Sequence, residues 1–188
     1  MEKVATALIV TVSFLLPWNA FSQDVIQPGL ARAQLTISPS YMFADRQSHF
    51  YLHGNLEVYA SKNISLVGEG YYYMNALSGE TSPFDFNHSG FFGVSWHRIK
   101  NNSDFYIGIQ PGLSFTRLTE QESNTTKTHT GVNPLFSSIV GYNFFVTRFF
   151  HFFVQTRIVA GEHNSDMHRR LTEMRFSAGL GVNVGGKK

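Results

Sequence analysis

Three residues late in the chain have the types that nucleophilic catalysis requires. His163 and Ser165 are separated by one residue, and Glu173 follows them. A serine nucleophile needs a base beside it and a carboxylate that orients this base, so the residue types would suit an esterase. His163 and Ser165, however, lie in a polar stretch that predicts a surface loop, whereas Glu173 begins a strand and faces inward. We therefore expect no catalytic residue, with esterase chemistry at these three positions as the alternative.

The histidines raise the question of a metal site. The chain has 8 of them, and His163 and His168 could meet His88 and His129 where several loops come together. Metal ligands are usually held at fixed spacing by a helix or strand, and no Asp or Glu companion is clearly placed here. We therefore expect exposed loop histidines, and neither a metal nor another cofactor.

A second set of charged residues falls on the inward side of the predicted strands. A charge that is removed from water has to be paired, so these side chains are expected to neutralise one another as a network that fills the interior. The alternative is a proton path or a gate. The residues of this predicted network are Glu57, Glu69, Arg157, Glu173 and Arg175.

Long two-faced strands would position these side chains. In residues 171–184, Phe176 and Leu180 lie on one face, and Arg175 and Asn183 lie on the other. This length suits a tilted strand that crosses a bilayer, which needs about 9 to 11 residues. Seven further stretches alternate in the same way, although Pro39 predicts an irregularity in the first. Stretch 133–145 carries large residues on both faces, and we expect Phe136, Val140, Tyr142 and Phe144 to face outward. These stretches are 32–43, 49–60, 64–75, 90–99, 105–118, 133–145 and 150–161.

The connections between these stretches alternate between short and long, which is typical of outer-membrane barrels with tight periplasmic turns and longer outward loops. The short turns are 61–63, 100–104 and 147–149, and the longer outward loops are 77–87, 119–130 and 162–170. Aromatic residues near the strand ends predict two girdles, one of Tyr59, Trp96, Phe105, Phe144 and Phe150 and one of Tyr41, Phe50, Tyr72, Phe92 and Phe115. The sequence thus predicts an all-β fold, an eight-stranded antiparallel up-and-down transmembrane barrel.

The N-terminus has the pattern of a secretory signal peptide. Lys3 precedes an apolar run that ends before Pro17, and small residues favour cleavage between Ser22 and Gln23. We expect 1–22 to be the signal peptide, 23–31 a lead-in segment, 32–184 the barrel and 185–188 a short tail. The mature chain has no uncharged apolar run of about 18 residues, so any span of the membrane would use strands.

The composition excludes several classes of protein. Charged residues make up 15% of the chain, against roughly 25% in soluble domains, while aromatic residues also make up 15%. The net charge of +2 is small, and the Lys and Arg residues are scattered along the sequence, so no nucleic-acid partner is expected. The absence of cysteine rules out disulfides and thiolate chemistry.

Over its whole mature length the chain resembles the small eight-stranded outer-membrane barrels of the OmpA/OmpX type. The resemblance rests on the eight alternating stretches and their connections, and it implies location in the bacterial outer membrane with lipid and lipopolysaccharide as neighbours. The chain departs from that family in ending on Gly185-Gly186-Lys187-Lys188 and not on an aromatic residue. The spacing of His163 and Ser165 is also similar to that in lipid A deacylase barrels.

We expect a non-enzymatic barrel with a structural or surface-interaction role. Eight strands enclose an interior that side chains fill, so a pore or small-ligand carrier is disfavoured. Any surface partner would bind the outward loops, where polar groups are available. Arg117, near the outward end of a strand, would lie among lipopolysaccharide phosphates. A lipid-modifying barrel enzyme is the alternative.

Overall fold

A computed structural model describes residues 26–44, 46–74, 84–122, 125–163 and 169–185. Every regular element in these ranges is a β-strand. None of these residues belongs to a helix that is long and apolar enough to span a membrane. The predicted signal peptide, residues 1–22, lies outside the described ranges.

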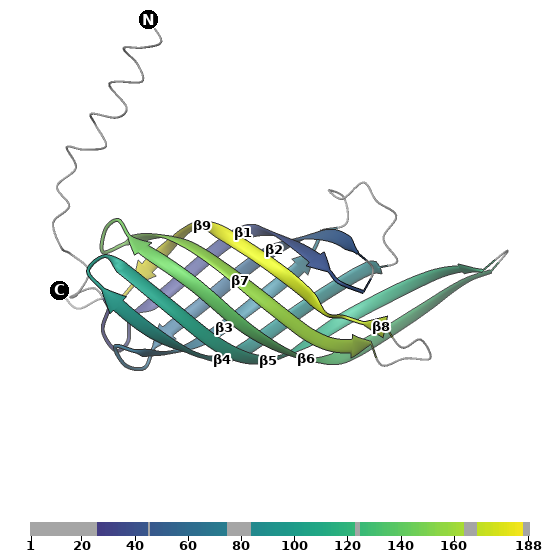
Figure 1. The fold of residues 1–188 in the computed structure, drawn as a ribbon, viewed down its shortest axis with the longest axis horizontal. Helices are drawn as coiled ribbons and strands as arrows, with labels where there is room; N and C mark the ends of the chain where they lie inside the picture. The colour runs from purple at the N-terminus through teal and green to yellow at the C-terminus, as the bar shows by residue number, and fades with distance from the viewer. Residues whose placement is uncertain (1–25, 45, 75–83, 123–124, 164–168, 186–188) are drawn as a thin grey trace, which may run out of the picture.

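The strands form one closed antiparallel barrel, in which β1 to β7 each pair with the next of these strands along the chain (Figure 1). Strand β9 pairs with both β1 and β7, so the sheet has no open edge between first and last strand. The short β8 pairs only with the end of β7. The strands are β1 (Ala31–Met42), β2 (Gln47–Tyr59), β3 (Ile64–Tyr73), β4 (Phe84–Lys100), β5 (Ser103–Glu122), β6 (Thr125–Phe145), β7 (Phe150–His163), β8 (Arg169–Arg170) and β9 (Glu173–Val184). The predicted eight-stranded barrel is confirmed, with β8 as one extra strand.

Alternation along the strands places apolar side chains outside and polar side chains inside. Leu35 and Leu56 are 67% and 68% exposed, whereas Arg157 and His97 are completely buried. Such an inverted distribution suits a wall that faces lipid and an interior that excludes it. The prediction for 133–145 is correct, because Phe136 and Val140 face outward. The placement of Tyr59 in an aromatic girdle is wrong, since this side chain is buried inside the barrel.

The turns at one end of the barrel are short and are fixed by local hydrogen bonds. In the β2–β3 turn, the backbone amides of Ala60 and Ser61 donate to the carbonyl oxygen of Ile64. The β4–β5 turn is shorter than predicted, because Lys100 pairs with Ser103 and only two residues connect the strands. Asp104 therefore belongs to β5 and not to a turn.

The seam between β1 and β9 is irregular, as Pro39 predicts. The two strands pair from Ala31 to Gln34 and again from Ser40 to Met42, with the same register on both sides of the interruption. Inside it, the Thr36 hydroxyl donates to the Ala178 carbonyl at 2.7 Å, and the Ser38 hydroxyl donates to the Phe176 carbonyl at 2.8 Å. Side-chain hydroxyls thus replace part of the backbone ladder.

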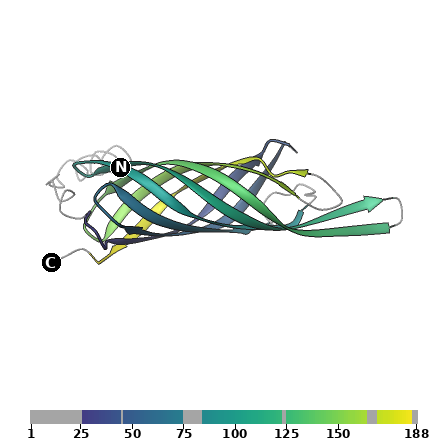
Figure 2. The same cartoon turned by 90° about the horizontal axis from the view of Figure 1, so that it is seen from below.

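The long outward loop predicted at 119–130 is wrong, because residues 119–122 and 125–130 extend β5 and β6 as a hairpin. Thr119 pairs with Thr128, and Gln121 pairs with Thr126. The hairpin projects beyond the rest of the barrel (Figures 1 and 2). Where its side chains are described, at residues 127–130, neither face is buried. The sequence of the hairpin lacks the alternation of apolar residues that marks the other strands, while its threonines favour strand.

The other two outward loops were also predicted too long. Residues 84–87 begin β4, Glu162 and His163 end β7, and Arg169–Arg170 form β8. Residues 77–83 and 164–168 lie outside the described ranges.

Apolar clusters close both ends of the interior. At the end with the short turns, Ile26 and Leu30 from the lead-in segment pack with Tyr59 and Phe145. Backbone hydrogen bonds hold the segment there, because Gly29 donates to Tyr59 and Tyr59 donates to Leu30. A larger cluster lies at the opposite end and comprises Met42, Tyr51, Tyr71, Tyr73, Phe84, Phe91, Leu118, Leu135, Val159 and Leu171.

Because the barrel is closed, it should resist unfolding by detergent without heating. We expect the protein to fractionate with outer membranes and to migrate faster unboiled than boiled on a denaturing gel. The measurement is densitometry of the two bands after stepwise heating. Recovery in a soluble periplasmic extract would contradict a membrane barrel.

Candidate functional site

The interior holds three charged clusters that follow one another along the barrel. The cluster nearest the short turns is built around Arg32, which donates to Glu57 Oε2 from Nε at 2.8 Å and to Asp104 Oδ2 from Nη1 at 3.0 Å. His97 lies between the same carboxylates, with Nε2 2.9 Å from Glu57 Oε1 and Nδ1 3.0 Å from Asp104 Oδ1. Tyr59 also donates to Asp104 at 2.9 Å.

Both nitrogens of His97 face carboxylate oxygens, so the geometry favours an imidazolium that donates in both directions. Two cations, Arg32 and His97, then balance two anions, Glu57 and Asp104. The arrangement meets the requirement that buried charges be compensated.

Glu69 is the centre of the middle cluster. Arg157 forms a salt bridge with its Oε1 at 2.5 Å, and His53 Nε2 lies 2.8 Å from its Oε2. Gln155 donates to Oε2 at 3.0 Å, and Gln110 donates to Oε1 at 3.2 Å. One arginine and one glutamate balance here, while the amides satisfy the remaining carboxylate lone pairs.

Arg175 and Glu173 form the outer cluster. Arg175 Nε donates to Glu173 Oε1 at 3.1 Å, and its Nη1 donates to Ser89 at 2.7 Å. The Tyr51 hydroxyl donates to Glu173 Oε2 at 3.2 Å. The guanidinium carbon also lies 4.3 Å from the centroids of the Tyr51 and Tyr71 rings, a distance that permits cation–π attraction.

Two arginines face each other directly across neighbouring strands. Arg157 of β7 and Arg175 of β9 are register partners. Like charges opposite each other destabilise a sheet. Here each guanidinium turns to its own carboxylate, Glu69 or Glu173, and both lie over the Tyr71 ring.

All five residues of the predicted charge network point into the interior. Arg157 pairs with Glu69, and Arg175 pairs with Glu173, two residues away on the same strand, whereas Glu57 pairs with Arg32 outside the predicted set. The sequence reasoning missed Arg32 as a partner, although the alternation in the first strand already places it on the inward side. It missed Asp104 because the preceding turn was predicted too long.

The structure does not assemble a catalytic triad from the described residues. Glu173 bonds to Arg175 and Tyr51, and Ser165 lies outside the described ranges. His163 was predicted in an exposed loop, but it ends β7 and is buried, since the alternation of β7 continues to its last residue. Neither of its ring nitrogens has a hydrogen-bond partner among the described residues.

The four histidines considered for a metal are spread over different surroundings. His88 stacks on the outer wall between Tyr72 and Phe86, His129 lies on β6, and His168 is outside the described ranges. Within the part of the chain that the structure describes, no group of three or more potential ligand residues gathers around a common point.

The interior is a packed core, not an aqueous path. Charged clusters, the amides of Gln110 and Gln155 and the aromatic ring of Tyr106 occupy it, and apolar clusters close its ends. Inward-facing glycines make room for this packing. A Cβ at Gly93, Gly108 or Gly141 would approach neighbouring atoms more closely than 3.0 Å.

Solved structures of small outer-membrane barrels share this fold. Neisserial surface protein A superposes with a TM-score of 0.61 at 13% identity, over 81% of this chain and 95% of that chain. Ail, the attachment invasion locus protein of Yersinia pestis, superposes with a TM-score of 0.59 at 10% identity, over 84% of this chain and 100% of that chain. OprG from Pseudomonas aeruginosa superposes with a TM-score of 0.56 at 9% identity, over 84% of this chain and 97% of that chain. At these identities the likeness concerns the fold alone, and it confirms the predicted resemblance to small outer-membrane barrels.

No protein-family model matches the chain, and no curated protein matches it by sequence.

Replacing Arg175 by Met should destabilise the barrel by about 3 kcal/mol, because it leaves the Glu173 carboxylate buried without its cation. Denaturant unfolding in detergent micelles measures the change. Adding Glu173→Gln should restore much of the loss, whereas Arg148→Met, at an exposed turn, should leave the unfolding midpoint unchanged. If R175M unfolds like the native chain, the outer ion pair is not needed for stability.

A packed interior should not conduct ions. We expect no steady single-channel currents when the purified protein is inserted into planar bilayers, with a large porin measured in parallel as the positive control. Reproducible open-channel steps from the folded protein would mean that the charged clusters rearrange into a pore.

Proposed function

We propose that this chain is an outer-membrane barrel that presents an interaction surface outside the cell. The observation that carries the proposal is the β5–β6 hairpin, which stands beyond a barrel whose interior is packed with side chains. Function is then expected where polar backbone and side chains meet water, since a rigid scaffold commonly carries its binding groups on such extensions.

The outer-membrane location is supported by two observations. Apolar side chains cover the outside of the wall, as lipid requires. Solved barrels of the same fold include proteins named for the outer membrane, for a bacterial surface and for attachment and invasion. The predicted signal peptide, residues 1–22, would deliver the chain to the periplasm, and the short turns would then lie on the periplasmic side of the membrane.

Among the described residues, the hairpin has strand edges with which no other strand pairs. Strand β4 pairs with β5 only as far as Leu118, and β7 pairs with β6 only as far as Leu135. Unpaired edges are liabilities that proteins usually cover, and they also accept an extended segment of a partner as an added strand. Side-chain bonds at the base, from Thr119 to Asp85 and from Arg117 to Thr130, hold the hairpin in place.

The alternative, a lipid-modifying enzyme that uses His163, Ser165 and Glu173, has less support. Glu173 is committed to Arg175 and Tyr51, and His163 is buried. A serine enzyme would be revealed if the purified protein removed acyl chains from lipopolysaccharide and Ser165→Ala abolished that activity.

Excising residues 120–127 should weaken surface binding and spare folding. Thr119 and Thr128 are register partners, so an Asn-Gly turn can join them without shifting either strand. Cells that display each variant are tested for adhesion to immobilised heparin and to extracellular-matrix protein. Heparin is included because Ail has been solved with the heparin analogue sucrose octasulfate.

We expect the native chain to retain cells on at least one of these surfaces and the excised chain to retain several-fold fewer. Lys62→Ala, in a turn at the opposite end, is the matched control and should adhere normally. Unboiled gel mobility verifies that each variant is folded. Full adhesion by a folded excised variant would refute a role for the hairpin.

A further inference from the structure

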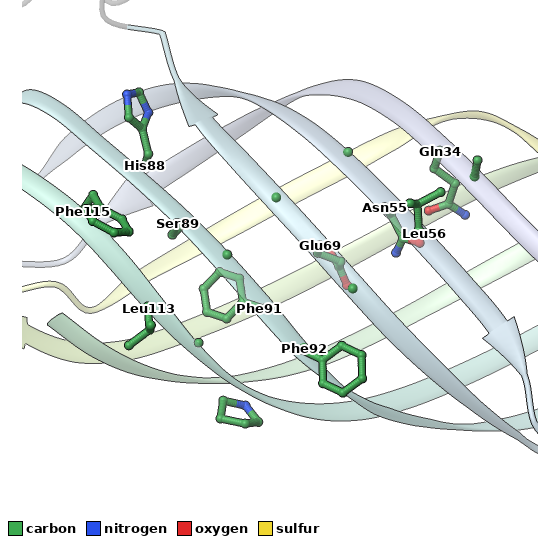
Figure 3. Close-up of a pocket in the computed structure, with 17 residues that line it drawn as sticks. Gln34, Asn55, Leu56, Glu69, His88, Ser89, Phe91, Phe92, Leu113 and Phe115 are labelled. Atoms are coloured by element: carbon green, nitrogen blue, oxygen red, sulfur yellow. The ribbon is translucent and has the colours of Figure 1, made fainter. Parts of the chain in front are cut away.

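The outer wall carries a groove that crosses five neighbouring strands, β1 to β5. Gly54 of β2 pairs with Gly70 of β3, which in turn pairs with Gly90 of β4, so the three glycines form one row. Leu35 and Leu113 are the next register partners on either side. The groove has a volume of about 900 Å³, and Figure 3 shows it running from Gln34 and Leu56 toward His88 and Phe115.

The chain itself does not require glycine at these three positions. None of them has a positive φ, and a Cβ at Gly70 would meet nothing within 4 Å. At Gly54 and Gly90 the nearest atoms would be 3.9 and 3.8 Å away, which is ordinary contact. Glycine within a strand lowers stability, so the row carries a cost that internal packing does not explain. The inward-facing glycines differ, since a side chain there would collide.

A stack of planar groups borders the outward end of the groove. The His88 ring lies 4.3 Å from Tyr72 and 5.2 Å from Phe86, and the planes are within 14° and 6° of parallel. The Tyr73 amide donates to His88 Nδ1 at 3.0 Å and fixes the ring. The guanidinium carbon of Arg117 then lies 4.8 Å from the Phe86 centroid.

Arg117 is a cation held in place without an anion. Its Nε donates to the Thr130 hydroxyl at 3.4 Å, and it forms no ion pair within the described part of the chain. Among the described side chains at the base of the hairpin, the carboxylate of Asp85 accepts a hydrogen bond from Thr119. The guanidinium is therefore available to an anion at the outward end of the wall.

We propose that this groove binds an acyl chain of lipid A, with a lipid A phosphate at Arg117. The proposal rests on the outer-membrane placement above. The floor of the groove lies in the lipid-facing wall, so the molecule that occupies the groove is apolar and comes from the bilayer. From Leu35 to Leu113 the row crosses four strand spacings of about 4.8 Å, roughly 19 Å, enough for much of an extended acyl chain.

Charge selects lipid A over a second copy of this chain. A second barrel wall would bring apolar side chains and another Arg117, and its nearest described carboxylate, Asp85, already accepts a hydrogen bond from Thr119. Phosphate groups of the outer leaflet do, and a guanidinium recognises phosphate through paired hydrogen bonds. The outward end of the groove places the headgroup in that leaflet.

The test uses the full-length mature protein in mild detergent, with purified hexa-acylated lipid A as the probe and native mass spectrometry as the readout. Gly70→Leu fills the groove at a position where an added Cβ would meet no atom within 4 Å. Ala160→Leu adds the same apolar side chain to the exposed outer face of β7, across the barrel, and is the matched control. Arg117→Gln removes the cation, and unboiled gel mobility verifies folding of all three.

We expect the native chain and A160L to retain one lipid A, G70L to bind it at least tenfold more weakly, and R117Q to lose selectivity over phosphatidylglycerol. Equal retention by G70L would overturn the site. Equal competition by phosphatidylglycerol in the native chain would overturn the choice of lipid A. A dimer that G70L dissociates would identify a second copy as the occupant. Failure of the outer-membrane placement itself would appear separately, as loss of heat-dependent mobility in the native chain.

Discussion

The whole structure depends on satisfying backbone hydrogen bonds where no water is present. A bilayer tolerates strands only if the sheet closes on itself, and the pairing of β1 with β9 provides this closure. The seam is also the place where the ladder is interrupted next to Pro39, and the hydroxyls of Thr36 and Ser38 bond the carbonyls of β9 instead. Small polar residues in a membrane strand therefore have a structural purpose here that hydropathy alone does not reveal.

Closure with eight strands leaves an interior just wide enough for side chains to fill, and this determines its chemistry. The three clusters each balance their charges locally, so none depends on a distant counter-ion. The aromatic ring of Tyr71 provides a π-face to both of the facing arginines. The result resembles a polar core more than a channel, and it leaves the outer wall and the hairpin as the surfaces that can meet other molecules.

Alternation of residue types was enough to predict which face of each membrane strand meets lipid, even for Phe136 and Val140 in the least regular strand. The alternation did not predict the hairpin, because a two-stranded ribbon that is exposed on both faces has no two-residue period of apolar residues. It also placed Asp104 in a turn and His163 in a loop, because strand ends are set by register. Partners such as Arg32 and Asp104 lie 72 residues apart, and only the stagger of the closed sheet brings them together.

The two edges of the hairpin differ in length, and the longer edge offers more room for an added strand of a partner. On the β4 side only residues 119–122 of β5 lack a ladder partner in the described structure, whereas on the β7 side residues 125–134 of β6 lack one. At about 3.3 Å per residue the longer edge extends roughly 33 Å along the strand. A segment that docks as an added strand would therefore approach from the β7 side and run antiparallel or parallel to β6. The first contact between such a segment and the hairpin would then lie beyond the lipid headgroups, where molecules that a layer of surface sugars keeps away from the membrane can reach it.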